Sequence, residues 1–311
     1  MTVVANDTDS QTLSVHRVAG NIGAVVDGID LGAPIGDAER AALVAALHEH
    51  KVLFFRDQRL GHADQIAFSR IFGPVTASHP YDDDAPTEFP EILQVDNRSY
   101  ERKFGVKAAS YTNEWHTDVT ALVNPPAVTI LRADVVPPRG GDTSWTNLAA
   151  AYAGLPKSLQ ELVDGLRAEH RFGGRRPVFT ATSSYGRKVG DVPLISERPV
   201  VRVHPVTGER ILFVTPGFTS RIIGYSRRQS DALLDLLFAE VTDPAYTVRF
   251  RWRPGSVAVW DNRATAHLAP SDVNHFDATR VLYRTTIEGD VPVGVDGRES
   301  VAISGGRFTG H

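Results

Sequence analysis

The apolar residues of this chain recur mostly with the two-residue period of β-strands, in short runs separated by turn formers. In "TVRFRWRPGSVAVWDN", the apolar Val248, Phe250 and Trp252 alternate with arginines, so that each kind takes one strand face. Further strands are predicted at LSVHRV, IGAVVDGIDL, VLFF, EILQVD, AVTILRADVV, DTSWTN, VVRVHP and RILFVT. Many short strands favour an all-β sandwich or barrel core decorated by helices over a βαβ series.

Helical spacing appears in fewer segments. Asp37 is suited to cap a helix through "AERAALVAALHEHK", and a second amphipathic helix is expected at "HADQIAFSRIF". A helix pair is predicted at "LAAAYAGL" and "PKSLQELVDGL", the second opening on Pro156, where helices tolerate proline. A longer helix is expected in "SRRQSDALLDLLFAEVTD". These helices would flank the β core.

Three segments have no regular period. Residues 1–12 are small and polar and are expected to form a flexible leader. The stretch "PVTASHPYDDDAPTEFPE" predicts a long loop, and loops of that length are often functional. Residues 172–199 are rich in turn formers and are predicted to be a lid or an insertion. No linker composition divides the remainder, so residues 13–311 are expected to form a single domain.

Composition narrows the chemistry. With 311 residues, 42% hydrophobic and 23% charged, the chain has the make-up of a soluble globular protein. A formal charge of -4 gives no electrostatic footprint for nucleic acid or for an anionic membrane, so local cations must hold any anionic ligand. There is no cysteine, which leaves histidine and carboxylates as the metal ligands. No signal-peptide pattern or membrane-length apolar run is present, so we expect a cytoplasmic protein.

The stretch "TNEWHTDVTALVNPPA" places His116 and Asp118 two residues apart among β-branched residues. Side chains two apart on a strand leave the same face, so a strand at "WHTDV" would direct both groups to one point. That arrangement suits a metal ion. A simple hydrogen-bonded pair at a sheet surface is the alternative, since two protein ligands rarely hold a catalytic metal.

A third ligand is available in His267, just past the buried strand in "VAVWDNRATAHLAP". The other histidines lie in polar helix ends, loops and the terminus, or in strands where they are more often satisfied sheet residues. Two histidines and one carboxylate on one face of an iron leave positions open for a chelating cosubstrate and for O2. Zinc hydrolases use similar ligands, so these three residues do not by themselves identify the metal.

Two arginines follow in "ATRVLYRTTIEGD", where Arg280 and Arg284 share one strand face with Leu282. An unpaired buried cation is costly, so each arginine needs an anionic partner. Guanidinium groups match carboxylate, sulfonate, sulfate or phosphate by forked hydrogen bonds. An ordinary ion pair with Asp or Glu is the alternative. Thr143, after the turn "RGGD", could add a hydroxyl to an anion site.

Taken together, "WHTDVT", "GGDTSWTN", "WDNRATAH" and "RVLYR" resemble the Fe(II)- and 2-oxoglutarate-dependent dioxygenases of the taurine dioxygenase (TauD/TfdA) family. Within that family the sequence is most similar to the alkylsulfatase-type members, through "AAAYAGLP", "ERPVVRVHPVTGER" and "GDVPV". The resemblance covers nearly the whole chain. It implies a mainly β fold with flanking helices around a double-stranded β-helix (jelly-roll) core.

The resemblance also implies roles for individual residues. His116, Asp118 and His267 would be the ligands of Fe(II), with 2-oxoglutarate and O2 as cosubstrates. Arg280 would pair with the distal carboxylate of 2-oxoglutarate, assisted by Thr143. The residues that would contact the substrate and its anionic group are His79, Val119, Ala121 and Arg284.

The implied reaction hydroxylates a C–H bond next to an anionic group. An alkyl sulfate ester or alkanesulfonate would yield an aldehyde and sulfate or sulfite, with succinate and CO2. Ala121 stands where the family commonly has an aromatic residue, and "LAPSDVNHFDAT" between His267 and Arg280 is about two residues longer than in relatives. These departures keep open a specialised-metabolism dioxygenase acting on a nucleotide, phosphate ester or carboxylate. A metal-bound, non-catalytic cupin-like protein is a third reading. Relatives often associate, so a homo-oligomer is expected.

Overall fold

The computed structural model describes residues 13–81, 86, 88–96, 114–175, 184–270, 272 and 278–309. The expected leader, residues 1–12, lies outside this range. Sixteen strands and six α-helices occur within the described residues, so the predicted mainly β class is confirmed.

The largest sheet has seven strands in the order β1-β2-β3-β13-β5-β15-β4. All neighbours are antiparallel except β2 and β3. The apolar runs "VLFF" and "VAVWD" form its buried centre, where β13 lies between β3 and β5. The strands are β1 Ser14–Arg17, β2 Ala24–Asp27, β3 Val52–Phe55, β4 Leu93–Asp96, β5 Val128–Val135, β13 Val257–Asp261 and β15 Val281–Thr286.

Three smaller sheets complete the strand framework. The four-stranded sheet has the order β11-β7-β8-β16, the three-stranded sheet the order β12-β6-β14, and β9 pairs with β10. In sequence order these strands are β6 Thr143–Asn147, β7 Arg167–Arg171, β8 Ile195–Pro199, β9 Val201–Val203, β10 Arg210–Leu212, β11 Thr219–Ile222, β12 Thr247–Phe250, β14 Thr265–Leu268 and β16 Val301–Ser304.

Strand β8 corrects part of the predicted lid at 172–199. Residues Ile195–Pro199 lie inside the four-stranded sheet, with β7 on one side and β16 on the other. Burial alternates along β8, but the buried side chains Ser196 and Arg198 are polar. The sequence of this strand therefore shows no clear hydrophobic period. The last residues of this segment therefore belong to the framework.

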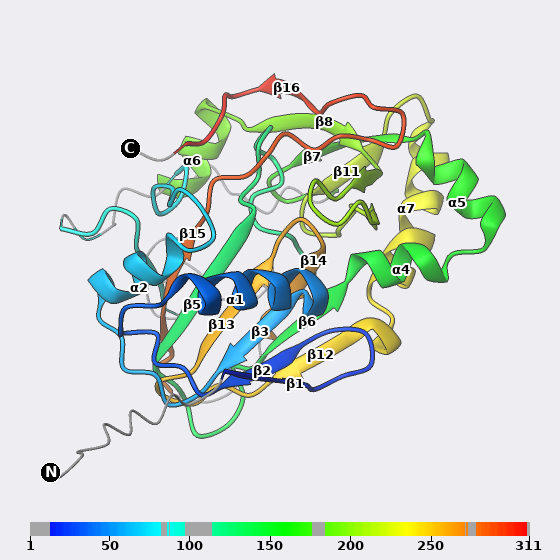
Figure 1. Cartoon of the computed structure of the whole chain (residues 1–311). Coiled ribbons are helices and arrows are strands. Elements are labelled where there is room, and N and C mark those ends of the chain that lie inside the picture. The colour runs from blue at the N-terminus through cyan, green and yellow to red at the C-terminus, as the bar shows by residue number, and fades with distance from the viewer. Residues whose placement is uncertain are drawn as a thin grey trace, which may run out of the picture.

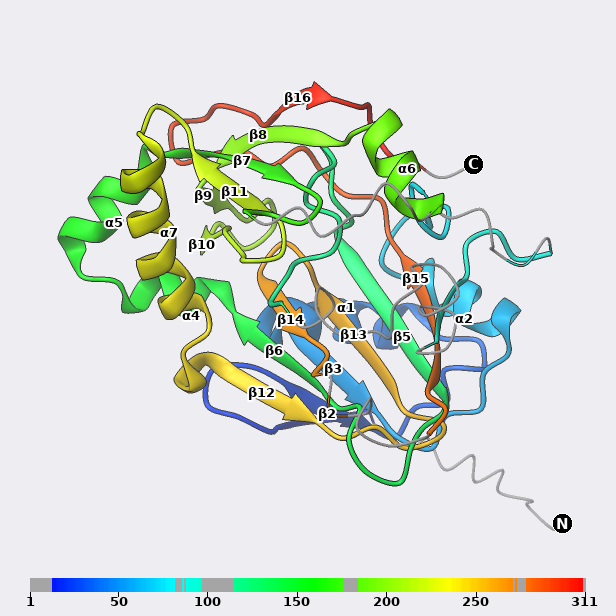
Figure 2. The ribbon, with the colours of Figure 1, turned by 180° about the vertical axis from the view of Figure 1, so that it is seen from behind.

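The helices flank the sheets, as expected. α1 (Asp37–His50) and α2 (His62–Ser69) lie on one face of the large sheet in Figure 1. α4 (Leu148–Gly154) and α7 (Arg227–Val241) pack on each other and on β10 and β11, with α5 (Lys157–Asp164) beside them (Figure 2). α6 (Ser184–Asp191) lies near the C-terminal end of the chain in both views.

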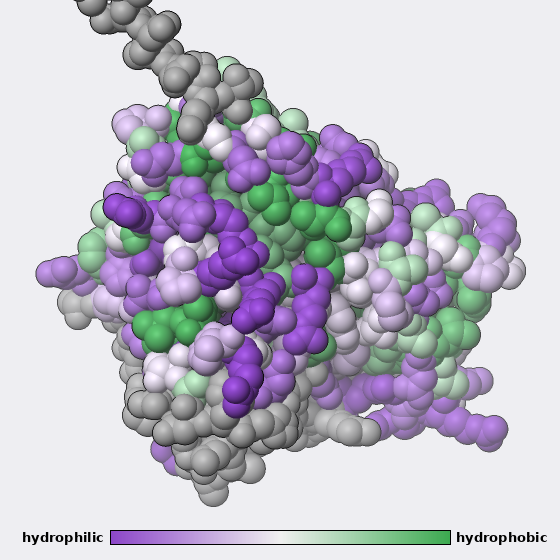
Figure 3. All heavy atoms as spheres, turned by 90° about the horizontal axis from the view of Figure 1, so that it is seen from below, coloured by the Kyte–Doolittle hydropathy of each residue, from purple (hydrophilic) through white to green (hydrophobic). Residues whose placement is uncertain are grey.

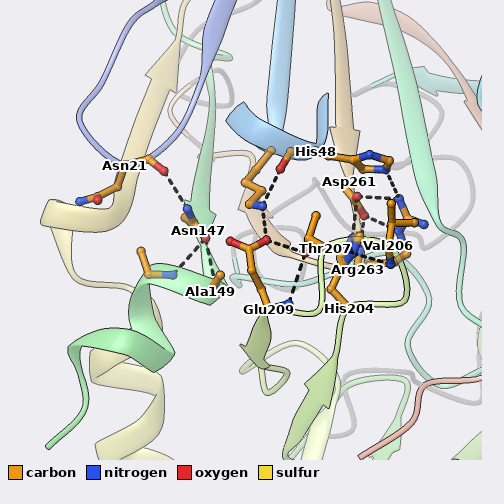
Figure 4. A network of polar contacts seen from close by, with 12 residues as sticks. Asn21, His48, Asn147, Ala149, His204, Val206, Thr207, Glu209, Asp261 and Arg263 are labelled. Carbon is orange, nitrogen blue, oxygen red and sulfur yellow. Dashed lines mark hydrogen bonds and ion pairs between the residues drawn. The ribbon is translucent and has the colours of Figure 1, made fainter. Parts of the chain in front are cut away.

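Helix starts follow the local sequence with one correction. Gly36, not Asp37, is the N-cap of α1, and its N–H donates to the Glu39 carboxylate at 3.0 Å. Asn147 caps α4 by accepting from the backbone N–H groups of Ala149 and Ala150 (Figure 4). Pro156 is the N-cap of α5, just ahead of the helix, where its missing N–H costs no helical hydrogen bond.

A band of aromatic side chains fills the space between the large and three-stranded sheets. Trp145 of β6 meets Trp260 of β13 at 5.5 Å between ring centroids, and Phe54 stacks on Phe250 at 4.2 Å. Phe250, the last residue of β12, and Trp252, two residues beyond it, are both 5% exposed, which confirms that these apolar residues share one side. This band brings the end of β13 and the start of β14 into one rigid region.

A buried ionic network holds the turn from β13 to β14 (Figure 4). Asp261 is fully buried and accepts from Arg263 Nε at 2.8 Å, from Arg263 Nη2 at 2.7 Å and from His204 Nε2 at 3.0 Å. Arg263 also contacts His48 at 3.2 Å, and His48 is half-buried. This network fixes the turn that leads into β14, the strand that carries His267.

The surface is mixed. In Figure 3 hydrophilic residues cross most of the face seen from below, and hydrophobic residues appear in several separate areas. Of the helices in the described ranges, none combines the length and the apolar character that a membrane crossing requires.

The network around Asp261 predicts a large stability effect. Asp261→Ala leaves Arg263 as a buried cation without its carboxylate partner, so the free energy of unfolding should fall by about 3–5 kcal/mol in chemical denaturation. Arg298→Ala, which removes an exposed pair with Asp296, is the control and should cost no more than about 1 kcal/mol. Equal effects of the two substitutions would contradict this assignment.

The same network has a defined pH dependence. Burial alone would raise the pKa of Asp261, but the hydrogen bond from His204 and the Arg263 guanidinium lower it below the ordinary 3.8. Because the folded-state pKa is depressed, the stabilisation is complete above the unfolded-state pKa of 3.8 and is lost progressively as the pH falls from there through the lower folded-state value. The difference in stability between wild type and Asp261→Ala should therefore be constant near neutrality and shrink once the pH falls below 3.8.

Candidate active site

Two histidines predicted as metal ligands face each other across a short antiparallel bridge. The His116 N–H donates to the His267 carbonyl at 2.9 Å, and the His267 N–H donates to the His116 carbonyl at 2.7 Å. The ring centroids are 4.2 Å apart. Residues at opposite positions of such a bridge point to the same side, so both imidazoles reach the same space.

The predicted strand at "WHTDV" is wrong beyond His116. Residues 118–120 form a turn, and Val119 has a φ of 45°, which is rare for a β-branched residue. Asp118 is directed instead by its contacts: Thr129 of β5 donates to Oδ2 at 2.6 Å, and Arg284 of β15 donates to Oδ1 at 2.9 Å. Tertiary hydrogen bonds outweigh local strand preference here.

The three predicted ligand side chains converge. One nitrogen of each histidine and one Asp118 oxygen all lie within 4.8 Å of one another. His267 Nε2 is 4.0 Å from Asp118 Oδ1. His116 Nδ1 lies 2.9 Å from the Glu114 carbonyl, which can only accept, so Nδ1 carries the proton and Nε2 is left to bind a metal. The arrangement fits a divalent ion.

The protonation states of His116, Asp118 and His267 also suit the binding of a metal ion. Burial, with His116 close by, lowers the pKa of His267 to about 3, and burial also lowers the pKa of His116. Burial alone would raise the pKa of Asp118, but the Arg284 guanidinium more than offsets it and the pKa lies below its ordinary value. Two neutral imidazoles and one carboxylate are therefore ready to coordinate. His267 Nδ1 is buried and has no hydrogen-bond partner among the described residues.

Arg284 joins the predicted ligands to the loop that carries His79. Besides its bond to Asp118, its Nη2 lies 3.5 Å from the Ser78 carbonyl. Its Nε is buried and makes no hydrogen bond to any residue that the structure describes. Arg284 therefore forms an ion pair with an acidic residue, Asp118, which was the alternative to binding a substrate anion. Its Nε–H is still able to donate a hydrogen bond to another group.

Thr143 contacts the aromatic band at Trp252, whereas His267 contacts it at Trp260. Arg280 lies beside Gly141, two residues before Thr143. The Arg280 Nε donates to the Gly141 carbonyl at 2.9 Å, and burial lowers the Arg280 pKa to about 10, so the group is charged at neutral pH. Gly141 has a φ of +69°, and a Cβ there would come within 2.9 Å of Arg280 Cδ. The close approach therefore requires glycine.

The Thr143 side chain projects from the same face of the three-stranded sheet as the His267 side chain. His267 is paired with Trp145, and Thr143 is two residues from Trp145 on β6, so all three side chains leave the same face. The Trp252 indole N–H donates to Thr143 Oγ1 at 2.9 Å. Because an indole only donates, the hydroxyl hydrogen of Thr143 can serve another acceptor.

An apolar cluster adjoins the ligands on the other side. Val119 and Ala121 are 5% and 1% exposed within it, and Phe218 lies 6.3 Å from the His116 ring. His79 has aromatic neighbours here, with ring centroids 6.0 Å from both Phe172 and Tyr185. The cluster consists of Tyr81, Val119, Ala121, Leu122, Phe172, Leu194 and Phe218, with Tyr185, Val189 and Phe308 packed against it.

Sequence reasoning missed the residues behind the ligands. Thr129 contacts Asp118, and Asn262 in turn donates to Thr129 Oγ1 at 2.7 Å. A threonine inside the apolar run "AVTILRADVV" and an asparagine beside the buried "VAVWD" were the available signals. Neither had a partner that could be named before the strands were placed.

Comparisons with known proteins show which family this chain resembles. A model of the taurine catabolism dioxygenase TauD, TfdA family matches residues 14–286. An alpha-ketoglutarate-dependent sulfate ester dioxygenase of Pseudomonas putida is 41% identical over 295 residues, covering 93% of each chain. An alkylsulfatase of Acinetobacter baylyi is 35% identical over 303 residues, covering 95% of this chain and 90% of the relative.

A solved structure supports the fold. The crystal structure of a taurine dioxygenase from Burkholderia xenovorans superposes with a TM-score of 0.81 at 46% identity, covering 94% of this chain and 95% of that one. The jelly-roll core expected from the motifs is thereby confirmed. The chain belongs to the TauD/TfdA family, whose members use Fe(II), 2-oxoglutarate and O2, and it is a non-haem dioxygenase of that kind.

Proposed function

We propose that this enzyme hydroxylates the carbon next to the sulfate or sulfonate group of a small organic anion, with His116, Asp118 and His267 as the iron ligands. The observation that carries the proposal is the position of Arg284, whose guanidinium contacts Asp118 at 2.9 Å and keeps a buried N–H without a partner among the described residues. An anionic substrate held there lies beside the metal site. Two relatives named for sulfate esters and alkyl sulfates support this substrate class.

The ligands need little rearrangement to hold Fe(II). The Glu114 carbonyl keeps the His116 ring in the tautomer with a free Nε2. Asp118 Oδ1, which also accepts from Arg284, lies 4.0 Å from His267 Nε2 and is the oxygen that we propose for the metal. When bound, Fe(II) would activate O2, so that one oxygen atom turns a substrate C–H into C–OH and the other oxidises 2-oxoglutarate to succinate and CO2. The protein contributes ligands, orientation and charge.

For 2-oxoglutarate we propose Arg280 and Thr143 as the anchors of the distal carboxylate. Arg280 keeps its charge at neutral pH in a buried setting, where a charge-assisted hydrogen bond is strong. Thr143 has a hydroxyl hydrogen to donate and lies on the sheet face that His267 shares.

For the substrate we propose that Arg284 and His79 hold the anionic group, while Val119, Ala121 and the aromatic residues of the apolar cluster hold the organic part. Cation and apolar wall together select an amphipathic anion. α6 supplies Tyr185 and Val189 to the cluster, and the Tyr81 hydroxyl donates to the Val192 carbonyl at 2.7 Å. We propose α6 as the lid that the segment before β8 was expected to form.

The products follow from the position of the new hydroxyl. On a carbon that carries a sulfate ester, the C–O bond to sulfate breaks, the hydroxyl loses its proton and an aldehyde forms as sulfate leaves. On a carbon that carries a sulfonate, the C–S bond breaks and sulfite leaves. Arg284 and His79 would decide which carbon is presented, and the rate depends strongly on such positioning.

The metal assignment predicts a spectroscopic result. Anaerobic Fe(II) and 2-oxoglutarate should give a weak visible charge-transfer band, which His116→Ala should abolish because one ligand is lost. Arg280→Ala should keep Fe(II) binding but need more 2-oxoglutarate to develop the band. His16→Ala, at an exposed histidine on β1, is the matched control. A band that survives His116→Ala in folded protein would contradict the ligand set.

The substrate assignment predicts a pattern of coupling. Succinate formation should be stimulated by alkyl sulfates or alkanesulfonates more than by matched phosphates and carboxylates. His79→Ala should raise the KM for those substrates about 10–100-fold, the value of a hydrogen bond to a charged group, with the charge-transfer band unchanged. If only phosphates, nucleotides or carboxylates couple, the alternative of a specialised-metabolism dioxygenase is correct.

A further inference from the structure

A chain of buried hydrogen bonds connects the core to the predicted metal carboxylate. The Trp260 indole N–H donates to Asn262 Oδ1 at 2.9 Å, Asn262 Nδ2 donates to Thr129 Oγ1 at 2.7 Å, and Thr129 donates to Asp118 Oδ2 at 2.6 Å. All four residues are at most 2% exposed. Three separate segments of the chain contribute, so the arrangement is a tertiary feature.

Donor chemistry allows only one direction along this chain. An indole N–H cannot accept, so the oxygen of the Asn262 amide must face Trp260 and its NH2 must face Thr129. With that NH2 filling an acceptor site of the Thr129 oxygen, the single hydroxyl hydrogen of Thr129 goes to Asp118. An ionised carboxylate accepts only, which completes the series.

We infer that Thr129 and Asn262 are positioning residues for the iron ligand Asp118; this rests on the proposed ligand set. They hold Oδ2 through a charge-assisted bond and so turn Oδ1 toward His267 Nε2, 4.0 Å away. We call the series Trp260, Asn262, Thr129 and Asp118 the relay. The ring of Trp260, its first residue, also lies 4.9 Å from the His267 ring. One tryptophan therefore helps to orient two ligands, one by packing and one by hydrogen bonds.

Metal affinity without any turnover tests the relay. Thr129→Val keeps the shape but removes the donor, and Mn(II) titrated alone by calorimetry should bind about 10–100-fold more weakly, as for other partners of metal ligands. Thr129→Ser restores the hydroxyl and should restore affinity. Thr285→Val is the matched control, because Thr285 lies on the same sheet as Thr129 but its buried hydroxyl pairs with Ser69 of α2 and not with Asp118.

The outcomes separate this inference from the proposed function. If wild type binds Mn(II), His116→Ala does not, and Thr129→Val binds as tightly as wild type, the relay has no positioning role and the ligand set stands. Equal weakening by Thr285→Val would mean a general loss of stability and would also overturn it. Asn262→Asp is a second variant: a carboxylate there competes for the Thr129 hydrogen, so affinity should fall although Thr129 is intact.

A second, independent feature concerns the C-terminal segment. Asn124, 2% exposed, donates to the Phe308 carbonyl at 2.8 Å and accepts from the Phe308 N–H at 2.8 Å. The segment reaches this point after β16, and Gly305, with a φ of +87°, passes so close to Leu194 that a Cβ would lie 2.3 Å from its Cδ2. The Phe308 ring packs against the apolar cluster that contains Val119 and Ala121.

We propose that Phe308 is a specificity-determining residue that forms part of the wall around the organic portion of the substrate. The proposal rests on the same apolar cluster as the proposed function but on a part of the chain outside the family match, which ends at residue 286. Two hydrogen bonds between the buried Asn124 amide and the Phe308 backbone hold the residue in place. Burial of such a ring against a ligand stabilises binding through apolar contact.

A chain-length series tests this role. With Phe308→Ala, the KM for a long alkyl sulfate such as dodecyl sulfate should rise about tenfold or more, from the lost apolar contact, while the KM values for ethyl sulfate and 2-oxoglutarate stay unchanged. Asn124→Ala should act in the same direction, because it releases the backbone of Phe308. Ile303→Ala, an exposed site on β16, is the control.

A uniform rise in KM across the series, or none, would contradict the role of Phe308. Failure of every alkyl sulfate to stimulate wild-type succinate formation would instead contradict the proposed substrate class. The two failures are therefore distinguishable.

Discussion

Asp118 carries a negative charge at 2% exposure, and the surrounding structure is arranged to make that charge tolerable. A buried carboxylate is stable only when it is paired and hydrogen-bonded. Arg284 supplies the opposite charge on one oxygen, Thr129 supplies a hydrogen bond on the other, and two neutral imidazoles lie close by. Strands β5 and β15, which carry Thr129 and Arg284, belong to the large sheet, whereas β14, which carries His267, belongs to the three-stranded sheet, so the site exists only when the two sheets are packed together.

The four-stranded sheet supports the turn at residues 118–120, which carries Asp118. His170 of β7 contacts the Thr120 hydroxyl at 2.9 Å, and Ser196 of β8 donates to the Thr120 carbonyl at 3.2 Å. Arg198, fully buried, donates to the Leu122 carbonyl. These polar groups would be costly in the core without such partners. They hold a turn in which Val119 has a strained backbone, and they thereby place Val119 and Ala121 in the apolar cluster.

Much of the architecture was readable from pattern. The alternation in "TVRFRW" and the apolar run "VLFF" became β12 and β3, and Leu282 and Arg284 do point inward while Tyr283 packs outward on His62 at 4.6 Å. The polar strand β8 escaped recognition because its buried side chains are Ser196 and Arg198, which period-based reading treats as exposed. Buried polar residues are where hydrophobic pattern carries least information.

The sequence by itself determined the kinds of chemistry: without cysteine, any metal had to be held by histidine and carboxylate, and the spaced motifs around His116, Asp118 and His267 indicated the dioxygenase family. Only the tertiary structure decided how these residues meet. Local preference predicted a strand through Asp118, whereas a turn forms, since the bonds to Thr129, Arg284 and the second sheet outweigh that preference. The partners Asn262 and Phe308 are far from Asp118 and Ala121 along the chain, and no local pattern can specify contacts of that separation.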